Sequence, residues 1–184
     1  YGNHYYVVDW GVTARSFYAS HGGLCNSKFW GQEGLTWSFV TSYKPSFRFK
    51  PKEMIYSSVS PTVFRKDFSR DFYVLGLLNS NVGLHFLEII SSTIGTNVGE
   101  VLNFPVVRNQ VQAVVGLVEE NVLLCKNDWD SFEVSSDFLR HPLLLGKTAF
   151  EAYSAWKEQC SERFEKLKKN ETLLNEIFID NYEL

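Results

Sequence analysis

The sequence lacks the features that would place it in a membrane or on a secretion pathway. No uninterrupted apolar run approaches the roughly 18 residues that a transmembrane helix needs. The first residues, Tyr1-Gly2-Asn3-His4, carry neither the basic start nor the apolar stretch of a signal peptide. The chain also has no initiator methionine. We therefore expect a soluble fragment of a longer protein, without a membrane partner.

Cysteine is scarce, and its distribution argues against both a disulfide framework and a metal site. Cys25, Cys125 and Cys160 are odd in number, far apart and form no Cys-x-x-Cys pair. Because secreted frameworks use even numbers of closely spaced cysteines, we expect a reducing, cytoplasmic compartment. His21 lies close to Cys25, but no second pair completes a tetrahedral zinc site. We expect no bound metal.

Catalytic motifs are missing or only imitated. Gly146-Lys147-Thr148 imitates the end of a phosphate-binding loop, but His141 stands where that loop needs its first glycine. Ser154-Ala155-Trp156-Lys157 matches Ser-x-x-Lys without any other element of that chemistry. Asn103-Phe104-Pro105-Val106 lacks the second proline and the aromatic residue with which adenine methyltransferases grip a flipped base. We therefore expect no catalytic centre in this chain.

Charge and aromatic residues are unevenly distributed. The net charge is −3, yet residues 1–70 carry +5 and residues 71–184 carry −8. Residues 1–70 also hold 16 of the 29 aromatic residues. A basic, aromatic-rich half is compatible with a polyanionic partner. It is equally compatible with a packed sheet in which lysines on the exposed strands prevent aggregation. Charge alone leaves both interpretations open.

Hydrophobic periodicity predicts an α+β fold in which a β-rich half precedes a helical half. Strand-like patterns occupy residues 5–8, 28–30, 35–40, 47–51 and 54–64, so we expect strands up to about residue 68. A period of two puts Phe47 and Phe49 on one face, and Arg48 and Lys50 on the other. One face can thus pack while the other presents cationic groups. Pro61 favours an edge position for the last strand.

After residue 71 the apolar spacing becomes helical. We predict helices over 72–78 and 82–90, with a turn at Asn79-Ser80-Asn81, and a third helix from 110 to about 126. Thr148-x-x-Glu151 forms a capping box that opens a long amphipathic C-terminal helix, and we consider a break in it near Asn170. The expected division is residues 1–145 and a helix over 146–184, whose apolar stripe suits packing, self-association or contact with another subunit.

Several stretches of the sequence occur in the same order as in a known family. They include Glu33-Gly34-Leu35-Thr36-Trp37-Ser38, Phe47-Arg48-Phe49, Val98-Gly99-Glu100-Val101 and Asp128-Trp129-Asp130-Ser131-Phe132-Glu133. Together they resemble the C-terminal target-recognition region of PglX-type, BREX-associated adenine-specific DNA methyltransferases, also described as type II restriction enzyme methylase subunits. The sequence departs from the pattern of this family at Thr96-Asn97, Ser136 and Glu53-Met54, and these differences affect the geometry of local loops. We interpret Asp128-Trp129-Asp130 as an internal cap and packing point.

The resemblance implies a role in a restriction-modification or phage-defence system. It implies an upstream Rossmann-like catalytic domain, absent from this chain, which binds S-adenosylmethionine and methylates adenine. The chain itself would recognise the target sequence in double-stranded DNA, without catalytic activity or a cofactor of its own. The alternative is a protein-interaction module that assembles a larger complex.

The DNA hypothesis selects two groups of site residues. Phosphate contacts are expected from the exposed cations of the β-rich half, namely Lys28, Lys44, Lys50, Lys52, Arg65 and Lys66. Base-edge contacts are expected from Arg15 and Arg48, because a guanidinium can donate two hydrogen bonds to guanine. The loop residues Ser42, Tyr43 and Ser46 are expected to add to base recognition.

Overall fold

The computed structural model describes residues 1–64, 69–91 and 94–184, and all their side chains except those of residues 69–71. Arg65 and Lys66 therefore lie outside the described residues. The elements in chain order are α1 (Val12–Ser20), η1 (Ser27–Phe29), β1 (Gly34–Trp37), β2 (Phe47–Lys50), β3 (Thr62–Val63), α2 (Ser69–Asn79), α3 (Asn81–Ile90), α4 (Val98–Leu102), α5 (Val111–Trp129), η2 (Pro142–Leu144) and α6 (Ala149–Asn181). The fold is α+β, as the periodicity predicts, with helix dominating.

The sheet is small and antiparallel. Its strand order is β2-β1-β3, with Leu35 of β1 opposite both Phe49 and Val63. Leu35, Val63 and the two aromatic side chains of Trp37 and Phe47 are buried. The predicted strands at 35–40 and 47–51 are therefore present in shortened form, and the face that carries Phe47 packs inward as expected.

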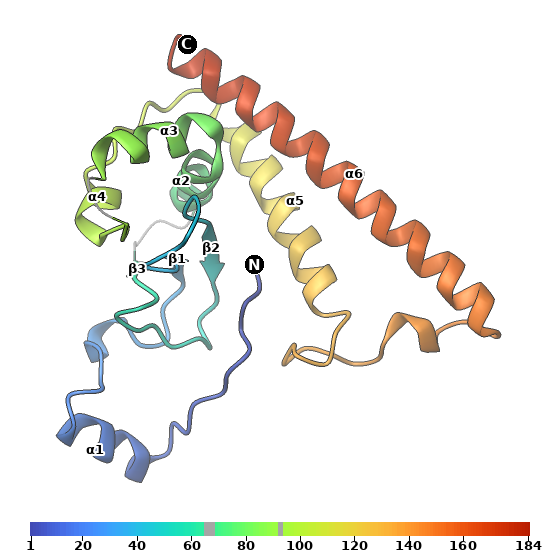
Figure 1. Ribbon diagram of the computed structural model, residues 1–184, viewed down its shortest axis with the longest axis horizontal. Helices are drawn as coiled ribbons and strands as arrows, with labels where there is room; N and C mark the ends of the chain where they lie inside the picture. The colour runs from blue at the N-terminus through green and yellow to red at the C-terminus, as the bar shows by residue number, and fades with distance from the viewer. Residues whose placement is uncertain (65–68, 92–93) are drawn as a thin grey trace.

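Helix α2 is the centre of the core. Tyr73, Leu77 and Leu78 have no exposed surface, and α2 contacts the sheet, α3, α5 and α6. Figure 1 shows α3 and α4 on one side of α2, and α5 and α6 on the other. A Cβ at Gly76 would lie 2.6 Å from Val118 Cγ2, so the absence of a side chain lets α2 and α5 pack closely.

A sharp corner joins α2 to α3 where the sequence predicts a turn. The Ser80 hydroxyl caps α3 by accepting a hydrogen bond from the Gly83 amide at 3.0 Å. Within the described residues no single helix is long and apolar enough to span a membrane. Helices α2 and α3 are long and apolar enough only when they are taken together, and the chain bends by 77° between them. Most side chains of α2 are buried in the protein core.

The long C-terminal helix forms, and the Thr148 half of its predicted capping box is confirmed. The Thr148 hydroxyl accepts a hydrogen bond from the Glu151 amide at 3.2 Å. The break near Asn170 does not occur: α6 is continuous, because Asn170 points into the contact with α5 and not into a turn. Leu174 and Phe178 belong to the main core. The proposed boundary at residue 146 stays a prediction.

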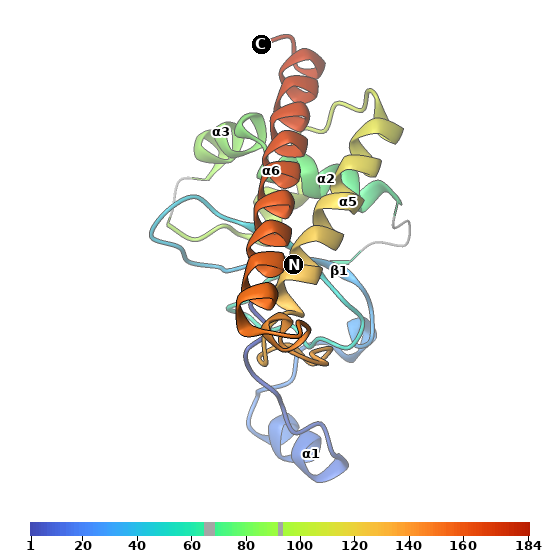
Figure 2. The same cartoon turned by 90° about the vertical axis from the view of Figure 1, so that its right-hand side faces the viewer.

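The N-terminal strand predictions are wrong. Residues 1–10 have no regular structure, and Lys28 lies in the 3-10 helix η1 that Asn26 caps. Most of 54–64 is irregular, and only Thr62–Val63 forms a strand. Between the first two of these segments, helix α1 projects from the body of the molecule, as Figures 1 and 2 both show. β-prone residues form strands only when another strand pairs with them, and for residues 5–8 the described chain supplies none.

Candidate nucleic-acid interface

The loop between β1 and β2, residues 38–46, gathers four of the predicted site residues. Ser42, Tyr43, Lys44 and Ser46 are all exposed, and Tyr43 is the most prominent, with 83% of its surface exposed. This loop carries a cation, hydroxyl groups and an aromatic ring within a few positions. Such a combination can meet phosphates, base edges and base faces.

Both ends of the 38–46 loop are fixed. At its start, Phe39 donates its backbone N–H to Val59 and accepts from the Thr96 amide at 3.0 Å, while the Trp37 indole donates to the Thr96 carbonyl at 2.8 Å. At its end, both backbone groups of Phe47 bond the Asn79 side chain. The loop is therefore anchored to the rest of the chain at both of its ends.

Three of the predicted phosphate-binding lysines are exposed. Lys44 lies 3.6 Å from Glu88 of α3, in an exposed ion pair that a phosphate could replace at small cost. Lys28 lies 5.7 Å from the centre of its neighbour Phe29. Lys52 is exposed in the turn after β2. These three side chains remain available to an external anion.

Lys50 differs from the expectation. Only 2% of its surface is exposed, and its ammonium donates to the Gln32 carbonyl at 2.7 Å and the Pro51 carbonyl at 2.9 Å. The Phe64 ring lies 5.8 Å from the same nitrogen. Burial lowers its pKa from 10.5 to about 8, although nearby Glu53 opposes the change. Alternation along β2 predicts the face of Lys50 but not the chain segments that cover it, so Lys50 is not part of the exposed cationic surface.

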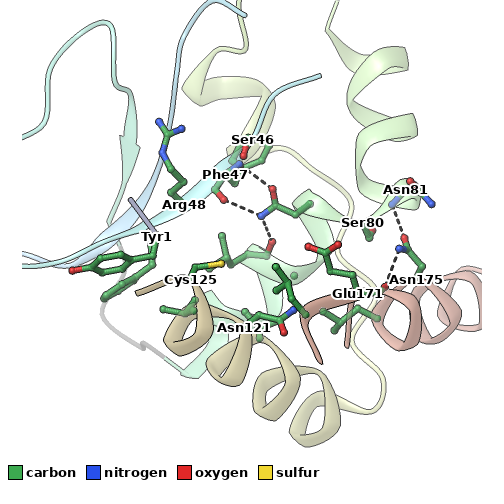
Figure 3. Close-up of a pocket in the computed structure, with 18 of the residues that line it drawn as sticks. Tyr1, Ser46, Phe47, Arg48, Ser80, Asn81, Asn121, Cys125, Glu171 and Asn175 are labelled. Atoms are coloured by element: carbon green, nitrogen blue, oxygen red, sulfur yellow. Dashed lines mark hydrogen bonds between the residues drawn. The ribbon is translucent and has the colours of Figure 1, made fainter. Parts of the chain in front are cut away.

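Arg48 lies at a cavity rather than on an open face. The cavity, of about 460 Å³, is bounded by β2, α2, α5 and α6, with Arg48 on the strand side and Glu171 on the α6 side (Figure 3). The Arg48 guanidinium donates to the Ser38 hydroxyl at 3.3 Å and is half-buried, which lowers its pKa. Burial raises the pKa values of Glu171 and of the Cys125 thiol. No sequence pattern indicates this cavity, because its walls come from distant segments of the chain, among them the N-terminal residues Tyr1 and Asn3.

Arg15 is not brought together with the other site residues. It lies on α1, a helix without buried residues that projects away from the sheet (Figure 2). Within the described residues its Nε is buried without a hydrogen-bond partner. The structure therefore gives no common surface to Arg15 and the 38–46 loop.

Asp128-Trp129-Asp130 has the structural role that the sequence suggests. Asp130 and Asp137 both bond the Lys126 ammonium, and Asp128 lies 3.3 Å from Arg163 of α6. The Trp129 ring makes an edge contact with Tyr5, at a centroid distance of 5.0 Å. This stretch thus ties the end of α5 to α6, to the following loop and to the N-terminal segment.

A metal ion and S-adenosylmethionine each make particular demands on the residues of a site. Among them, no group of three or more histidine, cysteine or acidic side chains could hold a metal ion. S-Adenosylmethionine, which the resemblance implies for a parent protein, binds Rossmann-like sheets at the carboxyl ends of parallel strands. The three strands described here are short and antiparallel, so these residues do not fit that cofactor.

The structure thus defines an α+β region with an exposed polar loop that carries Lys44, and an open pocket lined by polar and apolar side chains. No protein-family model matches the chain. Comparison with curated proteins finds adenine-specific methyltransferases. The chain is 34% identical over 199 aligned positions to the adenine-specific methyltransferase PglX of Lacticaseibacillus casei (strain Zhang), covering 100% of the chain and 17% of that relative. It is 25% identical over 176 positions to the adenine-specific methyltransferase BrxX of Escherichia coli O9:H4 (strain HS), covering 92% of the chain and 14% of that relative.

The chain is therefore homologous to one segment of the PglX-type adenine-specific methyltransferases. It spans less than a fifth of the length of these two relatives. The resemblance to PglX-type methyltransferases that the sequence motifs indicate is therefore confirmed, as a resemblance to one segment of these proteins.

Proposed function

We propose that the chain is a DNA target-recognition region of a PglX-type adenine-specific DNA methyltransferase in a restriction-modification or phage-defence system such as BREX. One observation supports this most directly: the chain aligns over its whole length with a protein named adenine-specific methyltransferase, and its described residues expose Lys28, Lys44 and Lys52 to an external anion. In such a protein, another domain supplies S-adenosylmethionine and the methyl transfer, in the cytoplasm, and this region positions that domain on double-stranded DNA.

The exposed lysines provide the sequence-independent part of binding. Lys44 and Lys52 flank β2, on the loop before it and the turn after it, and Lys28 lies in η1. Each phosphate that such a lysine neutralises steepens the dependence of log K on log salt by about 0.9.

Arg48 remains the candidate for base-edge recognition. A guanidinium has five N–H donors, and the described structure engages Arg48 through one hydrogen bond, to Ser38. The bond to Ser38 and the partial burial restrict its conformations before DNA binds. An arginine ordered in this way loses less conformational entropy when it bonds a base.

A salt series on the 184-residue chain tests the proposal. We expect a fluorescent random-sequence duplex to bind, with an affinity that falls steeply as salt is added. Lys44→Glu with Lys52→Glu should lower the salt slope by about 0.9 for each lost contact. The matched control, Lys157→Glu with Lys168→Glu, reverses two exposed lysines of α6 and should change the slope less. Failure of the unsubstituted chain to bind duplex DNA would reject the proposal.

A protein-interaction module is the second candidate, and a specific feature of α6 favours it. The N-terminal half of this helix exposes Phe150 by 78% and Phe164 by 61%, and such apolar groups suit a protein contact. If this function is the correct one, the chain is indifferent to DNA and associates with itself or another subunit. Phe150→Ser with Phe164→Ser should then abolish the association in sedimentation experiments while leaving the helix content unchanged.

A further inference from the structure

The cavity beside Arg48 has the make-up of a site for a small ligand. Its volume of about 460 Å³ lies within the range of ligand pockets in proteins. Leu75 of α2, Val118 of α5 and Leu174 of α6 are buried and form part of its wall. The apolar side of the cavity is thus built from packed core helices, and such a wall suits the hydrocarbon part of a ligand.

Glu171 adds a charge to this wall. Figure 3 shows it on the α6 side, across the cavity from Arg48. Its backbone carbonyl accepts a hydrogen bond from the Asn175 side chain at 2.9 Å, but no described residue bonds its carboxylate. Burial alone raises the pKa of Glu171. A carboxylate that loses water without gaining a partner costs free energy. Glu171 is nevertheless an exposed residue, so a ligand can reach it.

The cations of the chain do not serve as the partner of this carboxylate. The Arg48 guanidinium donates to the Ser38 hydroxyl at 3.3 Å. Lys168, three residues earlier on α6, forms no ion pair with Glu171 in the described part of the chain. Asn121 of α5 also has a free group: its Oδ1 accepts a hydrogen bond from α6, while its Nδ2 has no described partner. The cavity therefore offers a charged acceptor and an amide donor to a ligand.

We propose that this cavity binds an alkylammonium group, with its charged head on the Glu171 carboxylate and its hydrocarbon stem on the apolar wall. A hydrogen bond between two charged groups is stronger than a neutral one, and a neutral ligand would leave the carboxylate unpaired. The charge of −8 on residues 71–184 also favours a cation over an anion. A free amine and a lysine side chain of another protein segment both have this chemistry. The inference does not depend on DNA binding.

An NMR titration of the 184-residue chain with n-butylammonium chloride, at constant ionic strength, tests the proposal. We expect saturable shifts of the Glu171 carboxyl carbon and the Asn121 side-chain amide. The uncharged n-butanol, which has the same stem, should bind at least about 10-fold more weakly. Glu171→Gln should weaken n-butylammonium binding by a similar factor. Glu176→Gln removes an exposed carboxylate of α6 and should leave the binding unchanged.

A second titration, with Nα-acetyl-lysine methylamide, separates the two sources of the amine. Tighter binding than n-butylammonium indicates a lysine side chain of a protein segment, and weaker binding indicates a free amine. The proposal is wrong if neither amine gives saturable shifts, or if Glu171→Gln binds n-butylammonium as tightly as the unsubstituted chain does. Glutamine has nearly the shape of glutamate, and circular dichroism should show that the variants fold alike. Neither titration contains DNA, so a failure here leaves the proposed DNA function standing.

Discussion

The side chain of Asn79 replaces a neighbouring strand on the outer edge of β2. Its Oδ1 accepts from the Phe47 N–H, and its Nδ2 donates to the Phe47 carbonyl, both at 3.0 Å. Because β2 lies at the edge of the sheet, these backbone groups would otherwise have no strand partner. One amide at the end of α2 therefore connects the helical core to the sheet and fixes the loop that ends at Phe47.

We predict that Asn79→Ala destabilises the chain by about 1–3 kcal/mol, because it leaves part-buried donors and acceptors unpaired. Urea denaturation provides the measurement, as a shift of the midpoint with an unchanged slope. Asn127→Ala, at an exposed position of α5, is the matched control and should shift the midpoint little. Equal effects of the two substitutions would contradict the prediction.

The helical half could be predicted from the sequence because its signals are local. Apolar residues at helical spacing indicate α2, α3, α5 and α6, and the caps at Ser80 and Thr148 use side chains that the sequence displays next to each helix. The break considered near Asn170 does not occur, for a reason that is not local. A polar residue in an apolar stripe resembles a break until a partner helix supplies Glu120 and Asn121 for it.

The β-rich half and the site could be predicted only in part. Alternation identifies β2, but it does not show that backbone carbonyls and the Phe64 ring enclose Lys50. Tyr6 and its neighbours have strand-forming side chains and yet remain unpaired, because pairing depends on distant segments. The exposed loop of Tyr43 and Lys44 could be predicted because its signal is local: polar and charged residues around a proline indicate a surface turn.

Asn170 joins α6 to α5 at a buried position. With 1% of its surface exposed, it donates to Glu120 at 2.8 Å and to Asn121 at 2.9 Å. The hydrogen bond from Asn170 to Glu120, together with the hydrogen bond and charge of Lys166, lowers the pKa of Glu120 below its ordinary value of 4.5. We predict that Asn170→Ala raises the Glu120 pKa towards that value, as an NMR titration of the carboxyl carbon would show. An unchanged pKa in the variant would mean that Lys166 alone sets it.

Lys126 closes the loop that follows α5. Burial alone would lower its pKa, but hydrogen bonds to Asp130 and Asp137 outweigh it and raise the pKa. We predict that Lys126→Met frees residues 130–137, seen as faster amide exchange in that segment, and costs about 1 kcal/mol because the site is partly exposed. Lys147→Met, at an exposed position, serves as the control. Unchanged exchange at Asp137 would contradict the prediction.

Lys50 gives the chain a pH dependence whose sign follows from its burial. Its pKa is about 8 in the folded chain, against 10.5 ordinarily. Between these values the unfolded chain binds more protons, so stability rises with pH, by at most about 1.4 kcal/mol per pH unit. We expect urea unfolding from pH 7.5 to 9.5 to show this rise, Lys50→Met to abolish it, and Lys52→Met, at the exposed neighbouring position, to retain it. Parallel curves for the unsubstituted chain and Lys50→Met would show that the folded structure does not disfavour the charged ammonium of Lys50.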